Sequence, residues 1–292
     1  MQNDPAELKR LLLSLQAESG AFASTVHSGK DSLSDYNGFV TALVLRELEP
    51  VAGLHGWDAP LGRALDFLEE CESPARPGMF FFWPPDRWPL WAPGIPEDCD
   101  CTATMASELV HYGRMGLDKA RAIAANALLP YRVDTERKTP EKPWIRTGVF
   151  LTWHYSGPAP NPVDIVVNVN VAAFLAQTGS THHPAYGQAC QMIFDGIRWC
   201  NRRWENLERL SPYYPEPWEL IFALHHALRR GAADLEASIA ELRQFPAPAL
   251  ADDPSKILFG MADRSTRWAS TALWAARRVA MNSAGRVSAR PV

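Results

Sequence analysis

Residues 96–109 read PEDCDCTATMASEL, a stretch in which carboxylates, cysteines and threonines come directly before an alanine-rich apolar run. A polar start of this kind suits a helix N-terminus, where side-chain oxygens accept hydrogen bonds from otherwise unpaired backbone N–H groups. Four further stretches share the form, one of them loosely, and they recur roughly every 50 to 70 residues, a spacing typical of repeat architectures. They are 34–48, 163–175, 213–228 and 262–276.

The segments between these stretches predict partner helices with more charge on one face, such as 117–129 and 234–245. Apolar inner helices that alternate with amphipathic outer helices close most simply into a ring. The sequence therefore predicts an all-α fold, a single α/α toroid over residues 1–281, followed by a disordered tail at 282–292. An open α-solenoid of the same hairpins is the alternative. The stretch DIVVNVNV at 164–171 suits a strand or a helix, and we assign it to a helix because it aligns with the other stretches.

In a closed ring the N-termini of the inner helices gather at one mouth together with their polar caps. The side chains expected around that one cavity are Asp35, Asp98, Asp100, Thr102, Asn168, Asn170 and Asp263.

The composition argues against several classes of protein. The chain of 292 residues has a formal net charge of -4 and its Lys and Arg residues form no stripe, so nucleic acid is not expected as a partner. The first residues suit neither a signal peptide nor a membrane span, which favours a cytoplasmic location. Five cysteines are an odd number in a chain long enough for a good core, and they indicate free thiols rather than a disulfide framework.

One short motif resembles the glutamine and aromatic repeat of the squalene and oxidosqualene cyclases. In LLSLQAESGAF, residues 12–22, Gln16 is followed by Gly20 and Phe22, and this phenylalanine stands where the family usually has tryptophan. The resemblance implies the helical repeat fold of those enzymes.

A second motif resembles the acid motif of the same enzymes. DCDCTA, residues 98–103, is similar to the D-x-D-D-T-A of hopene and diterpene class II cyclases, and its last four letters are similar to the D-C-T-A-E of oxidosqualene cyclases. The sequence departs from the first pattern at Cys101 and from the second at Thr104.

The resemblance implies a class II terpene cyclase, in which a carboxyl protonates an isoprenoid alkene or epoxide and the resulting carbocation cyclises. By carry-over, Asp100 is the acid, Cys101 orients it, and Asp98 has an auxiliary role. His154 is a candidate partner, because hopene cyclases place a supporting histidine in a comparable stretch. Burial and the nearby carboxylates of Asp98 and Glu97 would keep such an acid protonated, whereas a helix N-terminus favours its ionised form.

A carbocation must be held without being quenched by water, and aromatic faces do this through their quadrupole. The chain supplies many aromatic side chains in loops just before the expected inner helices. With one amide added, the candidates for substrate binding are Phe82, Trp83, Trp91, Trp144, Trp153, Asn170, Tyr213, Tyr214 and Trp218. Several of these rings could instead fill the toroid as core.

No metal is expected. Cys99 and Cys101 lack the second pair that a structural zinc site needs. A zinc site of the kind found in protein prenyltransferase β subunits, which share the toroid, could draw on His225 or His226, but that family's local sequence is missing around them. The reaction needs no cofactor, although a diphosphate on the substrate would introduce Mg²⁺.

The expected partner is a hydrophobic isoprenoid small molecule. Because hopene-type enzymes have two toroids and this chain has room for one, a homodimer or a peripheral contact with a membrane surface stays open. Two other functions also stay open: a noncatalytic toroid that binds an isoprenoid or a partner, and a carbohydrate-active α/α barrel. In the plainest interpretation, Glu97, Asp98 and Thr102 do no more than cap a helix.

Overall fold

The computed structural model divides the chain into two compact units, each described by itself below. It describes residues 5–49, 56–92, 94–135, 139–155, 160–246, 256–263 and 265–284. Unit 1 is made of the described residues within 1–72, 81–95 and 251–291, and unit 2 of those within 73–80 and 96–250.

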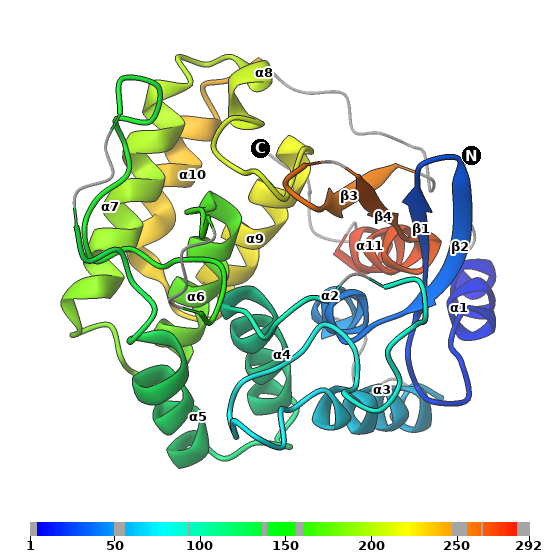
Figure 1. The fold of residues 1–292 in the computed structure, drawn as a ribbon. Coiled ribbons are helices and arrows are strands. Elements are labelled where there is room, and N and C mark those ends of the chain that lie inside the picture. Colours follow the sequence, from blue (N-terminus) through cyan, green and yellow to red (C-terminus); the bar gives the residue numbers. More distant parts are fainter. Residues whose placement is uncertain are drawn as a thin grey trace. The chain divides into compact units, whose positions relative to one another are not determined.

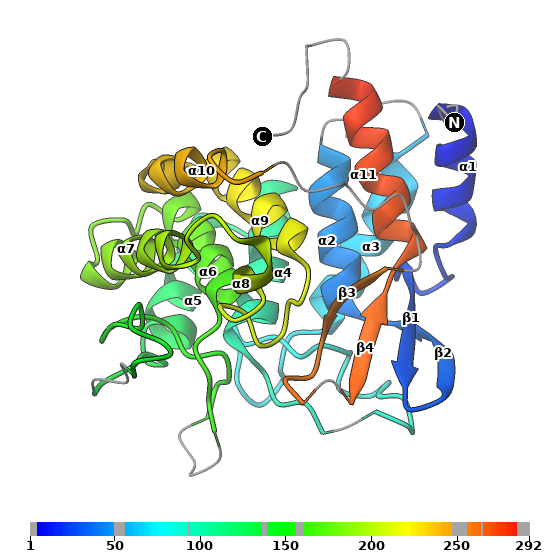
Figure 2. The ribbon, with the colours of Figure 1, turned by 90° about the horizontal axis from the view of Figure 1, so that it is seen from above.

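Unit 1 combines an antiparallel sheet with four helices, in which α11 packs against both α1 and α2 (Figure 2). The sheet has the strand order β2-β1-β4-β3, so its two central strands come from opposite ends of the chain. The elements are α1 (Pro5–Ser14), β1 (Ala23–Ser28), β2 (Asp31–Tyr36), α2 (Gly38–Leu48), α3 (Asp58–Glu70), β3 (Ile257–Gly260), β4 (Thr266–Ala269) and α11 (Thr271–Ala284).

This sheet shows that the prediction of an all-α fold, a single α/α toroid, was wrong, because the protein is a mixed α and β structure. Residues 34–36 of stretch 34–48 lie in β2, and residues 266–269 of stretch 262–276 form β4. A two-residue turn closes the β1–β2 hairpin, and Gly29 in this turn has a φ of +59°. A glycine in a two-residue turn is a recognised sequence signal of a hairpin. The pairing of β1 with β4 joins Val26 to Trp268, and local helical periodicity cannot reveal a contact so distant in sequence. Asp263 is exposed between β3 and β4.

A buried carboxylate fastens these elements of unit 1 together. Asp35 accepts hydrogen bonds from the indole nitrogens of Trp83 and Trp268, both at 2.8 Å. Asn37 and Ser24 donate to the same carboxylate, at 2.7 and 3.4 Å. Asp35 is 1% exposed, and these donors compensate for the loss of its hydration.

Unit 2 is helical, and α6 lies in its middle with α4, α7 and α9 packed around it (Figure 1). Its elements are α4 (Cys99–His111), α5 (Leu117–Ile123), the π-helix η2 (Ala124–Leu128), α6 (Ile165–Gln177), α7 (Pro184–Trp199), α8 (Trp204–Leu207), α9 (Pro217–Arg229), the 3₁₀ turn η3 (Ala233–Leu235) and α10 (Glu236–Leu242).

The sequence of α6 is rich in valine, which disfavours a helix locally, yet every residue from Ile165 to Leu175 is buried. A helix that is apolar on all sides gains its stability from packing rather than from propensity. The helical interpretation of 164–171 is therefore confirmed. Across the described residues, no helix combines the length and the apolar character needed to cross a bilayer.

Three of the repeated stretches share one arrangement at the start of their helix. An Asn or Asp side chain caps the first turn, and the polar side chain four residues later accepts a hydrogen bond from the backbone N–H of a distant phenylalanine. In α2 the three residues are Asn37, Thr41 and Phe22; in α4 they are Asp98, Thr102 and Phe80; in α6 they are Asp164, Asn168 and Phe150.

A glycine with positive φ stands two residues before each of these phenylalanines: Gly20, Gly78 and Gly148. At Gly20 a Cβ atom would lie 2.0 Å from the carbonyl oxygen of Arg63, so no larger residue fits there. The amide of Gln16 donates to the carbonyl oxygens of Gly20 and Pro60, which explains the glutamine of this motif. The Gly-x-Phe unit thus occurs three times, and only the first of the three follows the glutamine of the recognised motif.

Thr102→Val should lower the free energy of unfolding, because it keeps the shape of the side chain but leaves the buried N–H of Phe80 without its acceptor. The expected loss is about 1–3 kcal/mol. Thr104→Val is the matched control on the same helix. The Thr104 hydroxyl is buried and has no hydrogen-bond partner among the described residues, so its removal should cost nothing. Urea denaturation of both variants measures the difference, and equal losses would contradict the arrangement.

Candidate active site

Asp98 is the N-cap of α4 and one of the buried carboxyls of unit 2. Its Oδ1 accepts a hydrogen bond from the backbone N–H of Cys101 at 2.6 Å, and the Cys101 side chain also hydrogen-bonds to this carboxyl. Burial first, and the charge of Asp100 second, raise the pKa of Asp98 to about 7. Cys101, expected as the orienter of Asp100, therefore lies beside Asp98.

Asp100 lies in the first turn of the same helix, and its side chain is held by two donors from other parts of unit 2. Asn170 of α6 donates its amide N–H to Oδ1 at 2.7 Å. Tyr214, in the segment before α9, donates its hydroxyl to Oδ2 in a short hydrogen bond. Both donors favour the carboxylate form, since each bond is strongest when the acceptor is charged. Of the residues expected to bind substrate, these two contact the expected acid.

A third carboxyl, Asp164, belongs to the same group and was missed as a site residue. It is the N-cap of α6, it is fully buried, and its Oδ2 accepts hydrogen bonds from the Ser211 hydroxyl and the Tyr213 backbone N–H. Burial first, with the charge of Asp100 as a further cause, raises the pKa of Asp164 to about 7. One sequence signal could have found it: Asp164 stands directly before the apolar run of 165–175, and an aspartate in that position is typical of a helix N-cap.

We call Asp98, Asp100 and Asp164 the carboxyl cluster, and two of its members, Asp98 and Asp164, have pKa values of about 7. Carboxylates that share a buried site cannot all ionise easily, because each negative charge disfavours the next. Such a cluster can hold a proton at pH 7 and release it when the resulting anion is stabilised.

His154 is buried next to this region but makes no side-chain hydrogen bond to a described residue. Its ring packs against Tyr131 at 4.6 Å, and burial together with the charge of Arg76 lowers the pKa of His154 to about 3. The imidazole is thus neutral at pH 7. Arg76 also forms an ion pair with Glu97. The negative charge of Glu97, which was expected to help keep Asp100 protonated, is therefore compensated by Arg76.

The other substrate-binding candidates are divided between the two units. In unit 1, Phe82, Trp83 and Trp91 belong to an aromatic cluster that continues to Phe39, Phe259 and Trp268. In unit 2, the indole N–H of Trp153 donates to the Tyr213 hydroxyl at 2.8 Å, Trp144 packs on Trp199, and Trp218 packs on Phe222. Trp153 and Tyr213 adjoin the carboxyl cluster through the Tyr213 backbone bond to Asp164.

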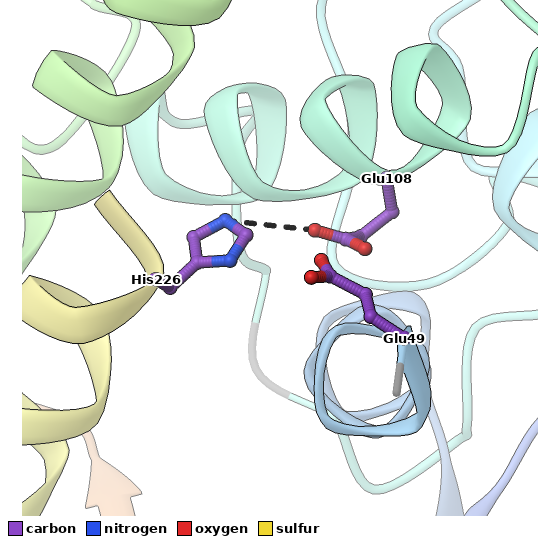
Figure 3. A group of neighbouring side chains, drawn as sticks. All are labelled: Glu49, Glu108 and His226. Atoms are coloured by element: carbon purple, nitrogen blue, oxygen red, sulfur yellow. Dashed lines mark ion pairs between the residues drawn. The ribbon is translucent and has the colours of Figure 1, made fainter. Parts of the chain in front are cut away.

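Of the two histidines that could have completed a zinc site, His226 lies on α9 and contacts α4 well beyond Cys99 and Cys101. His226 forms an ion-pair contact with Glu108, 3.6 Å from Nε2 to Oε1 (Figure 3). Glu108 is seven residues after Cys101, which corresponds to roughly 10 Å along a helix. Burial also raises the pKa of the Cys99 thiol, which disfavours the thiolate that a zinc ion requires. All five cysteines are buried free thiols.

Neither a protein-family model nor a curated protein matches this sequence. Among solved structures, a protein from Actinoplanes aligns with a TM-score of 0.48 and 16% identity over 97% of this chain and 100% of its own. The type II terpene cyclase MstE from Scytonema aligns with a TM-score of 0.44 and 13% identity over 97% of each chain. A variant of MstE with its substrate geranylgeranyl dihydroxybenzoate aligns at 0.43 and 14%, over 96% and 95%.

Asp98→Asn should weaken the pH dependence of stability. A carboxyl whose pKa rises from 3.8 to about 7 on folding stabilises the fold fully below about pH 4, and this contribution is lost as the pH rises through about 7. Asn still caps α4 but does not titrate. The free energy of unfolding of the variant should therefore fall less between about pH 4 and about pH 8, by on the order of a few kcal/mol.

Urea denaturation at both pH values measures this change. Asp118→Asn removes a fully exposed aspartate from the first turn of α5 and is the control. The interpretation of Asp98 is wrong if the Asp98 variant and this control lose stability with pH equally.

Proposed function

We propose that this protein protonates an isoprenoid alkene or epoxide and cyclises it through a carbocation, as class II terpene cyclases do. The observation that carries the proposal is the buried carboxyl cluster at the start of α4 and α6. Two of its members, Asp98 and Asp100, lie in the DCDCTA motif that resembles the acid motif of those enzymes. The motif alone is short. In the structure the motif's two aspartates are buried beside a third carboxyl, Asp164 of α6, and the sequence did not reveal this neighbour.

In this proposal Asp100 is the proton donor. An acid strong enough to protonate an alkene must leave behind a well-stabilised anion. The donors from Asn170 and Tyr214 are already aimed at the two oxygens of Asp100, so no reorganisation is needed when the negative charge forms. Before the proton is transferred, negative charge on Asp98 or Asp164 disfavours ionisation of Asp100, which keeps Asp100 protonated in the resting enzyme.

The chemistry balances without a redox partner. The π electrons of the terminal alkene form the new C–H bond with the proton of Asp100, and the O–H electron pair stays on the carboxylate. For an epoxide, the oxygen takes the proton and a C–O bond breaks. Further double bonds of the substrate attack the cationic carbon in turn, and loss of a proton ends the sequence. The reaction is an isomerisation, so the proposal includes no cofactor.

The substrate proposed is a hydrophobic isoprenoid. Trp153 and Tyr213 adjoin the carboxyl cluster, because the Tyr213 backbone N–H donates to Asp164 and the Trp153 indole donates to the Tyr213 hydroxyl. They are the first candidates to face a carbocation. The number of isoprene units is an outcome of the experiment below.

Incubation with farnesyl and geranylgeranyl substrates in D₂O should give cyclic products that carry a single solvent deuterium at the protonated carbon, detected by mass spectrometry. Asp100→Asn keeps size and hydrogen-bonding capacity but removes the acid. Its turnover should fall by at least about a hundredfold, the scale of a lost general acid. The matched control is Asp118→Asn, which should keep full turnover because the residue is fully exposed on α5.

Full activity in the Asp100 variant would overturn the assignment of the acid. If the wild-type protein binds these substrates but forms no product, the protein is a noncatalytic isoprenoid-binding module and not an enzyme.

A further inference from the structure

The two oxygens of Asp164 have different partners. Oδ1 accepts hydrogen bonds from the backbone N–H groups of Val166 and Val167, at 2.8 and 3.3 Å, and so caps α6. Oδ2 accepts from the Ser211 hydroxyl at 2.6 Å and from the Tyr213 backbone N–H at 3.1 Å. Only a carboxylate or carboxyl group can accept on both sides, since an Asn side chain would present N–H donors to one of them.

The bonds on Oδ2 fasten the segment that carries Tyr214. The Ser211 hydroxyl oxygen, held by Asp164, also accepts a hydrogen bond from the Tyr214 backbone N–H at 3.2 Å. The backbone N–H of Ile165 donates to the carbonyl oxygen of Leu210 at 3.2 Å, which closes the same junction. Segment 210–214 is thereby fixed to the first turn of α6.

The far end of this segment reaches Asp100. The Tyr214 hydroxyl donates to Oδ2 of Asp100, while Asn170, on the same helix as Asp164, donates to Oδ1. All four side chains are buried. A continuous set of hydrogen bonds thus runs from Asp164 through Ser211 and Tyr214 to Asp100.

We propose that Asp164 is a positioning residue, which holds the Tyr214 hydroxyl on Asp100 by fastening segment 210–214 to the start of α6. The effect of this positioning on turnover rests on the proposed function, because the Tyr214 hydrogen bond influences how readily Asp100 releases its proton. The hydrogen-bond geometry itself stands without any substrate.

The alternative is that Asp164 influences Asp100 by its charge alone. The titratable groups that face Asp164 are Asp100, Tyr213 and Tyr214, and each interacts with it electrostatically. The two mechanisms predict opposite signs. Removing a nearby negative charge would make Asp100 a stronger acid, whereas releasing Tyr214 would take a donor from the Asp100 carboxylate and make it a weaker acid.

The experiment is a pH titration of the full chain labelled with ¹³Cγ-aspartate, followed by NMR, with the Asp100 signal assigned from its loss in Asp100→Asn. Asp164→Asn keeps the cap on α6 but leaves the Tyr213 N–H without its acceptor. Ser211→Ala breaks the same junction and leaves the charge of Asp164 in place. Tyr214→Phe removes the donor itself. Ser211→Ala and Tyr214→Phe should each raise the titration midpoint of Asp100 by about one pH unit, and Asp164→Asn should raise it by less, because the loss of its negative charge opposes the shift.

Two further variants sharpen the result. The double variant Asp164→Asn with Tyr214→Phe should shift the midpoint no further than Tyr214→Phe alone, because both changes act through one hydroxyl and the lost charge of Asp164 only lowers the midpoint. Asp118→Asn, at a fully exposed position on α5, should leave the midpoint unchanged. If Asp164→Asn fails to fold, Ser211→Ala carries the test.

A lowered or unchanged midpoint in Asp164→Asn or Ser211→Ala would overturn the proposal, and so would an unchanged midpoint in Tyr214→Phe. This readout uses no substrate. Its failure is therefore distinct from failure of the proposed function, which is decided by product formation in Asp100→Asn.

Discussion

The constraint on which unit 2 depends is that α4 and α6 begin inside the protein. Backbone N–H groups at a buried helix start have no water to bond, so side chains must supply the acceptors. Asp98 and Asp164 do so, and their burial raises the pKa of both carboxyls to about 7. The need to cap two buried helices thus brings the carboxyls of the cluster together around Asp100.

The same helix start is built three times, but the context differs. In α2 of unit 1, the cap is the amide of Asn37, and the neighbouring carboxylate of Asp35 is occupied by two indole N–H groups. Asp35 therefore acts as a structural group. In α4 and α6 the caps are themselves carboxyls, and they adjoin a further one at Asp100. The same helix start thus recurs, and the choice of cap decides whether it carries an amide or an additional buried carboxyl.

The helices could be predicted more fully than the strands. The five stretches with a polar start each contain a helix, because capping residues and apolar spacing act over one or two turns. The sheet was missed because β1 and β4 pair across most of the chain, and the polar residues before α2 and α11 were interpreted as caps. The Gly29 turn was the one local signal of a hairpin.

By itself the sequence determined that residues 98–103 start a helix and that Asp98 caps it, since both depend on neighbours within one turn. Only the tertiary structure decided what surrounds Asp100. Its partners Asn170 and Tyr214 lie 70 and 114 residues further along the chain, and Glu97 is neutralised by Arg76 from an earlier loop. The proton affinity of a buried carboxyl is set by such contacts and by the exclusion of water, and both exist only once the helices have packed.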